Sequence, residues 1–266
     1  MEQKTVRGRF APSPSGRMHL GNLWSALLAW LSARSQGGEM VLRLEDLDPD
    51  RCTRAWCDQV MRDLEWLGLT WDNQPVYQSE RTAVYAEAFH ALEERETLSQ
   101  TRRPAWRVKV GQESITFCDL LQGEYKEDLK TDCGDFILRR SDGVYAYQLA
   151  VVVDDAAMGV TQVVRGSDLL SSTPRQIYLQ RLLGLPQPEY GHVPLLLAAD
   201  GRRLAKRDRD QELGELQSRY TAPELLGRLA HLAGLIPEPA PITAQELVPL
   251  FSWEKLTRED LKVEKF

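Results

Sequence analysis

The first 44 residues constrain the fold most strongly, because two short strand-like segments lie on either side of one helix-like stretch. We predict short buried strands at Val6–Ala11, which ends in a Pro/Ser/Gly loop, and at Met40–Leu44. Between them, the segment Leu20–Ala33 repeats its apolar residues at helical spacing: Leu20, Leu23, Trp24, Leu27, Leu28 and Leu31. A strand, a helix and a strand in this order favour a parallel pair joined by a right-handed crossover, so we predict an α/β fold.

Further along the chain, helical and strand-like segments continue to alternate, with one interruption. Helices are expected at about Thr53–Leu67 and Thr82–Glu94. Between about Ala105 and Arg140 the pattern changes to short strand-like pieces separated by Gly and Asp: Trp106–Val110, Ile115–Cys118 and Phe136–Arg140. This change predicts an insertion between two halves of the sheet.

The α/β pattern resumes near Tyr145. Strands are expected at Val160–Val164 and Val193–Ala198, and between them a helix to about Leu183, for which Thr173 is the expected N-cap and Pro174 the first helical residue. The chain therefore divides into a first half of the main domain (1–96), an inserted subdomain (97–143), a second half (144–210) and a C-terminal helical segment (211–266) with a Pro-rich break at Ile236–Pro241.

The loop between the first strand and the first helix carries the strongest binding signal. In an open parallel sheet, ligands bind at the carboxyl ends of the strands, and a helix N-terminus there offers free N–H groups to phosphate. Gly16 and Gly21 allow the backbone to approach a ligand closely, and His19 can donate a hydrogen bond to phosphate oxygens. A turn with one solvated histidine is the alternative for an isolated His-x-Gly.

Two segments together resemble the signatures of class I aminoacyl-tRNA synthetases: Arg9–Gly16 with His19–Asn22, and Arg203–Arg207. Three more segments are similar to the glutamyl branch of that family: Arg43–Asp48, Tyr145–Asp155 and Val164–Asp168. The resemblance covers most of residues 6–235 and is closest to short paralogues of glutamyl-tRNA synthetase that keep only the catalytic half. It implies a Rossmann-like parallel sheet with an inserted subdomain, and adenylate chemistry on ATP with Mg²⁺.

The resemblance also implies roles for individual residues. Gly16, His19, Gly21, Asn22 and Lys206 would bind ATP, with His19 and Lys206 as the catalytic residues. A lysine that swings in on the basic loop Arg202–Arg209 can stabilise the extra negative charge of a pentacoordinate α-phosphorus. Two positions depart from the signatures: Asn22 replaces a second histidine, and Ala205 replaces a serine. A solvated basic turn is the alternative for this loop.

A glutamate substrate requires a cation for its side chain, because a buried carboxylate must be paired. The resemblance implies a glutamate pocket made by Arg9, Phe10, Ala11, Pro12, Ser13, Glu45, Tyr147 and Arg165. Glu45 would receive the α-ammonium group and Tyr147 would add a hydroxyl, with Tyr145 as the competing candidate. A structural ion pair is the alternative for each arginine, and a core aromatic for Tyr147.

Members of this family usually carry a zinc-binding insertion with cysteine ligands after the helix that here ends near Glu96. In this chain Thr97–Arg107 contains no cysteine, so we predict no zinc on these residues. The module is either lost in this member or missing from the chain. Cys52, Cys57, Cys118 and Cys133 form no Cys-x-x-Cys pair and are expected to be reduced structural thiols.

Three functions remain open at this point. The short paralogues attach glutamate to queuosine in the anticodon of tRNA(Asp), and the chain ends at Phe266 without the anticodon-binding region of the long enzymes. The alternatives are a catalytic fragment of a glutamyl-tRNA synthetase, which charges the tRNA 3′ end, and a non-catalytic binding module. The net charge of −6 argues for a limited RNA contact, such as the anticodon stem-loop of tRNA(Asp). We expect a cytoplasmic location, because the sequence shows no apolar leader and no membrane span. A monomer is a separate expectation.

Overall fold

The computed structural model describes residues 5–101, 104–202, 204 and 212–263. Its first unit is the expected strand–helix–strand: β1 (Arg7–Phe10), α1 (Leu20–Arg34) and β2 (Glu39–Leu44). β1 and β2 are parallel, with Arg7 opposite Glu39 and Phe10 opposite Leu42. α2 (Arg54–Trp66), β3 (Val76–Tyr77), the 3-10 turn η1 (Gln78–Glu80) and α3 (Thr82–Glu94) follow, and β3 lies parallel to β2. The α/β class is confirmed.

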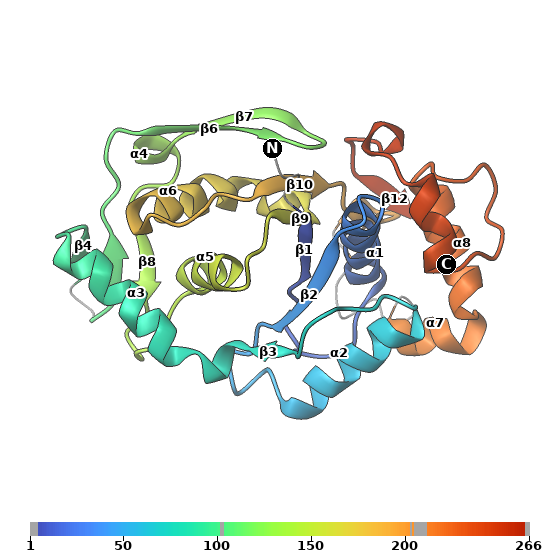
Figure 1. Ribbon diagram of the computed structural model, residues 1–266, viewed down its shortest axis with the longest axis horizontal. Helices are drawn as coiled ribbons and strands as arrows, with labels where there is room; N and C mark the ends of the chain where they lie inside the picture. Colours follow the sequence, from blue (N-terminus) through green and yellow to red (C-terminus); the bar gives the residue numbers. More distant parts are fainter. Residues whose placement is uncertain (1–4, 102–103, 203, 205–211, 264–266) are drawn as a thin grey trace.

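The second half of the sheet lies beside β1 (Figure 1). The Thr161 amide donates to the Arg7 carbonyl oxygen at 3.0 Å, which brings β9 (Gln162–Gly166) next to β1. β10 (Glu189–Val193) pairs parallel to β9 and continues the sheet. The connecting segments are α5 (Tyr147–Ala157) before β9, and the 3-10 turn η2 (Ser167–Ser172) with α6 (Thr173–Leu183) after it.

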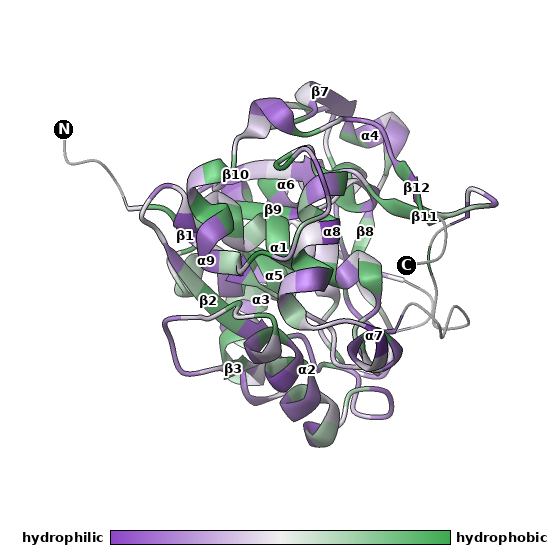
Figure 2. Cartoon of the chain, turned by 90° about the vertical axis from the view of Figure 1, so that its right-hand side faces the viewer, coloured by the Kyte–Doolittle hydropathy of each residue, from purple (hydrophilic) through white to green (hydrophobic). Residues whose placement is uncertain are grey.

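Successive side chains of a strand point to opposite faces of the sheet, and different helices cover the two faces. Met40 and Leu42 belong to the core that contains α1, whereas Val41 between them belongs to the core that contains α5 and α6. Figure 1 shows α1 and α5 on opposite sides of β1 and β2. In Figure 2, hydrophobic residues lie on α1 at the centre, and hydrophilic residues lie on α2 at the edge.

Residues 97–143 form two small antiparallel units. β4 (Leu98–Gln100), β5 (Trp106–Val108) and β8 (Phe136–Arg139) make a three-stranded sheet. β6 (Ser114–Asp119) and β7 (Gly123–Asp128) make a hairpin, followed by α4 (Leu129–Asp132). β6 also pairs with β10, where Tyr190 lies opposite Asp119, so this hairpin extends the main sheet. The proposed domain boundaries remain a prediction.

The C-terminal segment contributes to the hydrophobic core that contains α1. It comprises α7 (Leu213–Arg219), α8 (Ala222–Leu232), α9 (Ala244–Leu247), the 3-10 turns η4 (Val248–Leu250) and η5 (Trp253–Lys255), and β12 (Leu261–Val263). Their apolar residues belong to the same core as α1. Among the described residues, no helix is both long and apolar enough to cross a membrane.

Three sequence expectations were wrong in detail. The expected strand Val193–Ala198 is divided between β10 and β11 (Leu196–Ala198), because Pro194 between them lacks the N–H that a strand ladder needs. The segment 211–266 is not helical throughout, since β12 pairs with β11. Thr173 is the first residue of α6 and not its N-cap, and its hydroxyl accepts a hydrogen bond from Arg165.

Candidate active site

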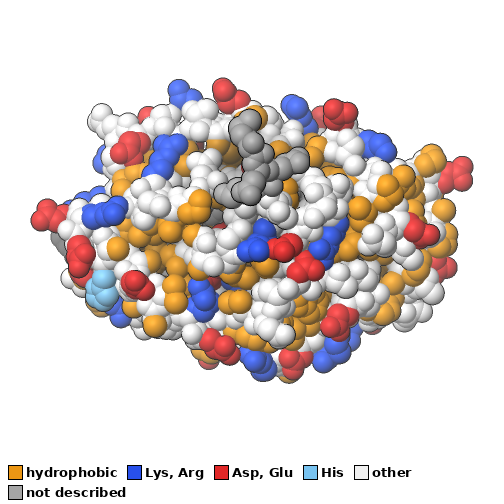
Figure 3. Space-filling model, viewed as in Figure 1, with side chains coloured by type: hydrophobic (Ala, Val, Ile, Leu, Met, Phe, Trp, Pro, Cys, Tyr) orange, Lys and Arg blue, Asp and Glu red, His pale blue; other side chains and the backbone are white. Residues whose placement is uncertain are grey.

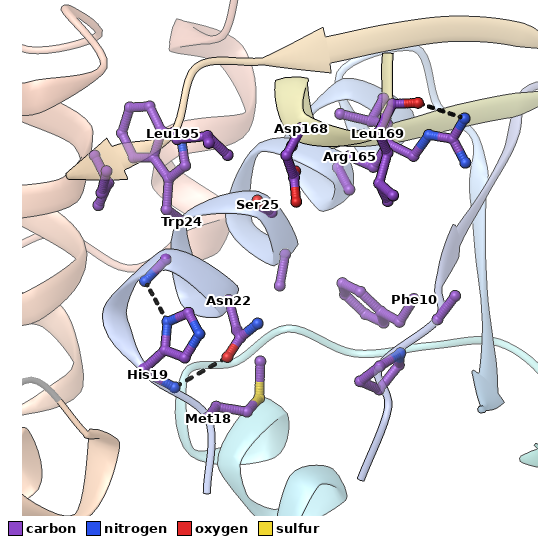
Figure 4. A pocket seen from close by; sticks show the side chains of 18 of the residues that line it. Phe10, Met18, His19, Asn22, Trp24, Ser25, Arg165, Asp168, Leu169 and Leu195 are labelled. Atoms are coloured by element: carbon purple, nitrogen blue, oxygen red, sulfur yellow. Dashed lines mark hydrogen bonds between the residues drawn. The ribbon is translucent and has the colours of Figure 1, made fainter. Parts of the chain in front are cut away.

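Two adjoining cavities of about 430 and about 750 Å³ open at the carboxyl ends of β1 and β9. They share Arg9, His19 and Arg165 among their lining residues, and we call them together the cleft. All the candidate residues that the structure describes line the cleft: Arg9, Phe10, Ala11, Pro12, Ser13, Gly16, His19, Gly21, Asn22, Glu45, Tyr147 and Arg165. Figure 4 shows the wall made by the start of α1 facing Phe10 and Arg165.

His19 is the N-cap of α1. Its Nδ1 accepts a hydrogen bond from the Gly21 amide at 3.2 Å, and its own amide donates to Asn22 Oδ1 at 3.1 Å (Figure 4). In a neutral ring the proton must then reside on Nε2, which makes that nitrogen a donor. Asn22 therefore completes a capping box in the place of the second histidine of the signature. Gly16, with φ of +150°, supplies a turn that other residues rarely adopt.

The described residues on either side of 205–211 lie close to the start of α1. Lys206, together with Ala205 and Arg207, lies outside the described residues. On one side of them Leu204 lines the cleft. On the other side Glu212 forms a β-bridge with His19, and the next amide donates to the Met18 carbonyl oxygen at 2.8 Å. Leu204 thus shares a cavity with His19, and the chain returns beside His19 at Glu212.

Arg9 and Arg43 lie in β1 and β2 and share the carboxylate of Asp155. Arg9 Nε is 3.1 Å and Arg43 Nη1 is 2.7 Å from Asp155 Oδ1, and all three side chains are buried. Arg43 Nη2 also donates to Glu45 Oε1 at 3.2 Å. Burial by itself would raise the pKa of Asp155, but the two guanidinium groups hold it below its usual value.

Glu45 has the opposite shift. Burial raises the pKa of its carboxyl, and the attraction of Arg43 and Arg9 only partly offsets this. Its amide donates to the Pro12 carbonyl oxygen at 3.0 Å, which fixes the end of β2 against the signature loop. Glu45 also lines the cleft, where its carboxylate can bind a cationic group of a ligand in addition to Arg43.

Arg165, in β9, is held mainly by neutral groups. Nε contacts His192 Nε2 at 3.1 Å, Nη2 donates to Thr173 Oγ1 at 2.8 Å, and Nη1 is 3.4 Å from the Tyr147 hydroxyl. Among the residues that the structure describes, no carboxylate forms a salt bridge with Arg165. This buried guanidinium can therefore pair with the carboxylate of a ligand.

The structure separates the two tyrosine candidates. Tyr147 lies beside Arg165 in the cleft. Tyr145 is buried and packs against the rings of Tyr85 and Phe89, at centroid distances of 6.0 and 5.9 Å. The position of Tyr147 is consistent with a role in ligand binding.

The sequence reasoning missed several residues that lie outside the cleft lining but hold its residues in place. Arg43 and Asp155 lie within segments that carried the family resemblance, and a charged residue inside an apolar strand or helix was the available signal. Asp119 and His192 meet only through the pairing of β6 with β10. In the described part of the chain, no three His, Cys, Asp or Glu residues group together in a way that could hold a metal ion.

Comparison with known proteins identifies the family. The family model "tRNA synthetases class I (E and Q), catalytic domain" matches residues 5–97 and 87–258. Its two segments overlap beside the junction at which the zinc insertion is expected to be missing. The fold is similar to a glutamate tRNA ligase from Elizabethkingia meningosepticum, with a TM-score of 0.85 over 98% of this chain and 68% of the other, at 23% identity.

Curated relatives are closer in sequence. A glutamyl-Q tRNA(Asp) synthetase from Symbiobacterium thermophilum is 41% identical, covering 96% of this chain and 95% of the relative. One from Deinococcus radiodurans is 45% identical, covering 93% and 96%. The first alignment spans 308 residues, more than the 266 of this chain, so that relative contains residues with no counterpart here. The chain belongs to the class I tRNA synthetases of the glutamyl and glutaminyl type, and within them to the glutamyl-Q tRNA(Asp) synthetases.

Proposed function

We propose that this protein activates glutamate with ATP and transfers it to queuosine in the anticodon of tRNA(Asp). The observation that carries the proposal is one cleft with two complementary ends. A helix N-terminus suited to phosphate lies at one end, and the buried Arg165 lies at the other.

The α1 end of the cleft would bind ATP. The Nε2–H of His19, the first amides of α1 and the backbone at Gly16 and Gly21 are donors or close-approach positions for phosphate oxygens. Asn22 fixes His19 through the capping box. Lys206 would approach from the basic loop during the reaction. Mg²⁺ would enter with the triphosphate, since this ion is commonly held by phosphates and few carboxylates.

The β9 end would bind glutamate. Arg165 and the Tyr147 hydroxyl would bind the side-chain carboxylate, with Arg9 as a further cation. Glu45 would receive the α-ammonium group. The segment Phe10–Ser13 would form the wall between the two substrates.

The reaction then has two displacement steps. An oxygen of the glutamate α-carboxylate attacks the α-phosphorus of ATP, and pyrophosphate leaves with the electron pair of the broken P–O bond. A hydroxyl of the queuosine ring next attacks the carbonyl carbon of the glutamyl adenylate. An ester forms, AMP leaves, and the hydroxyl proton passes to solvent or to the leaving group.

The first step can be tested by glutamate-dependent exchange of pyrophosphate into ATP, without any tRNA. We expect exchange, because Arg165, Tyr147 and Glu45 are already held in place by protein groups alone. Glutamine and aspartate serve as control substrates of altered charge and length. Strict dependence of exchange on added tRNA would contradict this account.

A further inference from the structure

A buried histidine lies directly behind Arg165. His192, in β10, is fully buried, and its two ring nitrogens face different partners. Nδ1 is 2.6 Å from Asp119 Oδ2, and Nε2 is 3.1 Å from Arg165 Nε. None of the steps proposed above uses this histidine or its aspartate.

The partners of the ring determine where its proton resides. An arginine Nε always carries a hydrogen, so His192 Nε2 must be the acceptor in this contact. The ring proton is therefore on Nδ1, where it is donated to Asp119. Burial and the neighbouring Arg165 lower the pKa of His192, although Asp119 opposes this shift, which is consistent with a neutral ring.

Asp119 is itself fixed by the backbone. Its Oδ1 accepts hydrogen bonds from the amides of Leu121, Gln122 and His192, at 3.0, 2.9 and 3.1 Å. Burial would raise the pKa of this carboxyl, but the hydrogen bonds from His192 and these amides lower it. The carboxylate is thus held ionised at the end of β6, with its second oxygen directed at His192.

Thr173 connects the same group to α6. Its hydroxyl accepts from Arg165 Nη2 and lies 3.1 Å from His192 Nε2. The Nε and Nη2 side of the guanidinium is therefore held by β10 and α6. Nη1, the remaining nitrogen, is directed toward Tyr147 and the cleft.

We propose that Asp119 and His192 are positioning residues for substrate recognition, because they fix the neutral Nδ1–H tautomer that orients Arg165 toward the carboxylate of glutamate. Asp119 acts through His192 and does not touch the substrate. The inference rests on the proposed function, since it assigns the ligand of Arg165 to the glutamate side chain.

The substitution Asp119→Asn tests this directly. Three backbone amides require an acceptor, so the side-chain oxygen of the introduced asparagine should face them and its NH₂ group should face His192. The ring must then accept at Nδ1 and carry its proton on Nε2, where it opposes the Nε–H of Arg165. We expect the KM for glutamate to rise roughly tenfold or more, with kcat changed only a few-fold and the KM for ATP unchanged.

Two further variants are compared with Asp119→Asn in the KM for glutamate. Arg165→Ala should give a larger rise in the KM for glutamate than Asp119→Asn. Ser32→Ala is the stability control: its hydroxyl donates to Gln162 at 2.6 Å in the core, where neither residue lines the cleft. It should lower the melting temperature and leave the KM for glutamate at the wild-type value.

The histidine tautomer gives a readout that does not depend on activity. A long-range ¹H–¹⁵N spectrum of the wild-type protein should show His192 protonated at Nδ1 only. A wild-type ring protonated at Nε2 would overturn the inference, as would Asp119→Asn with an unchanged KM for glutamate. Failure of the wild-type protein to activate glutamate would instead contradict the proposed function.

Discussion

Among single residues, the three buried arginines Arg9, Arg43 and Arg165 differ in their salt-bridge partners. Arg9 and Arg43 share Asp155, and Arg43 also pairs with Glu45. Arg165 forms no salt bridge with any carboxylate of the described residues, and its side-chain hydrogen-bond partners are His192, Thr173 and Tyr147. A desolvated cation of this kind favours a carboxylate over the neutral amide of glutamine, because an uncompensated buried charge is costly.

Lys206→Ala should slow adenylate formation much more than it weakens glutamate binding. The charge that Lys206 offsets develops mainly in the transition state, so the loss should appear in kcat, on the order of 10²–10³. The measurement is pyrophosphate exchange at saturating glutamate and ATP.

Arg202→Ala is the matched control for this change. It removes a cation from the same loop, but one that is already paired with Asp200 at 2.9 Å. An exposed pair of this kind contributes little, so its kcat should stay close to the wild-type value. Equal losses in the two variants would remove Lys206 from the mechanism.

Glu45 should make glutamate binding dependent on pH. Burial raises the pKa of this carboxyl, whereas a bound ammonium group favours its ionised form. Binding must therefore release a proton whenever Glu45 is protonated. The KM for glutamate should rise as the pH falls through the raised pKa of Glu45, and should level off above it.

Glu45→Gln tests the origin of that dependence. The variant cannot ionise, so its KM should be high and nearly independent of pH over the same range. The measurement is pyrophosphate exchange between slightly alkaline and mildly acidic pH. A wild-type profile without this rise, or an identical rise in the variant, would contradict the role of Glu45.

The sequence predicted the positions of candidate residues best where these residues lie close together along the chain. Gly16 and His19 lie in the loop between β1 and α1, and Asn22 lies in the first turn of α1. The order of these elements predicted that they lie at the carboxyl end of the sheet. The contact of Asp119 with His192 joins positions 73 residues apart. Only the register of β6 on β10 creates this pair, and no spacing in the sequence encodes that register.

Among the secondary-structure elements, periodicity predicted the long helices well and the short strands poorly. α3 has the expected bounds, Thr82–Glu94, and α1 extends one residue beyond its expected end at Ala33. β7 and β12 were not anticipated. Their residues are largely polar or partly exposed, and a strand of this kind is defined by its partner more than by its own composition.

The close contact of α8 with the Pro-rich break yields a stability prediction. A Cβ at Gly227 would collide with the backbone carbonyl of Ala240. In the interior of a solvent-exposed helix, Gly→Ala stabilises the protein by up to about 1 kcal/mol. Gly227→Ala should instead destabilise the protein by about 1–3 kcal/mol, because the backbone of α8 or of Ala240 would have to shift to remove the collision.

Urea unfolding of two variants measures this effect. Gly214→Ala in α7 is the control, since its Cβ would meet only the end of the Arg17 side chain, 2.6 Å away, which can turn aside. It should be neutral or slightly stabilising. A Gly227→Ala variant as stable as the wild type would show that α8 does not pack closely on this break.

Across the whole molecule, the negative net charge limits the surface area that can bind RNA. The chain has a net charge of −6, and Figure 3 shows acidic and basic side chains interspersed on the face in view. A contact with many phosphates usually requires clustered lysine and arginine side chains. The charge distribution on this face is consistent with recognition of a single-stranded loop inserted into the cleft.

The acceptor position on RNA tests the central claim most directly. The substrate is queuosine-containing tRNA(Asp) from which the 3′-terminal adenosine has been removed, incubated with radioactive glutamate and ATP. The same tRNA without queuosine, and intact tRNA(Glu), are the controls. We predict that the trimmed, queuosine-containing tRNA is labelled and that neither control is. Labelling of intact tRNA(Glu), with none of the trimmed tRNA(Asp), would contradict the account.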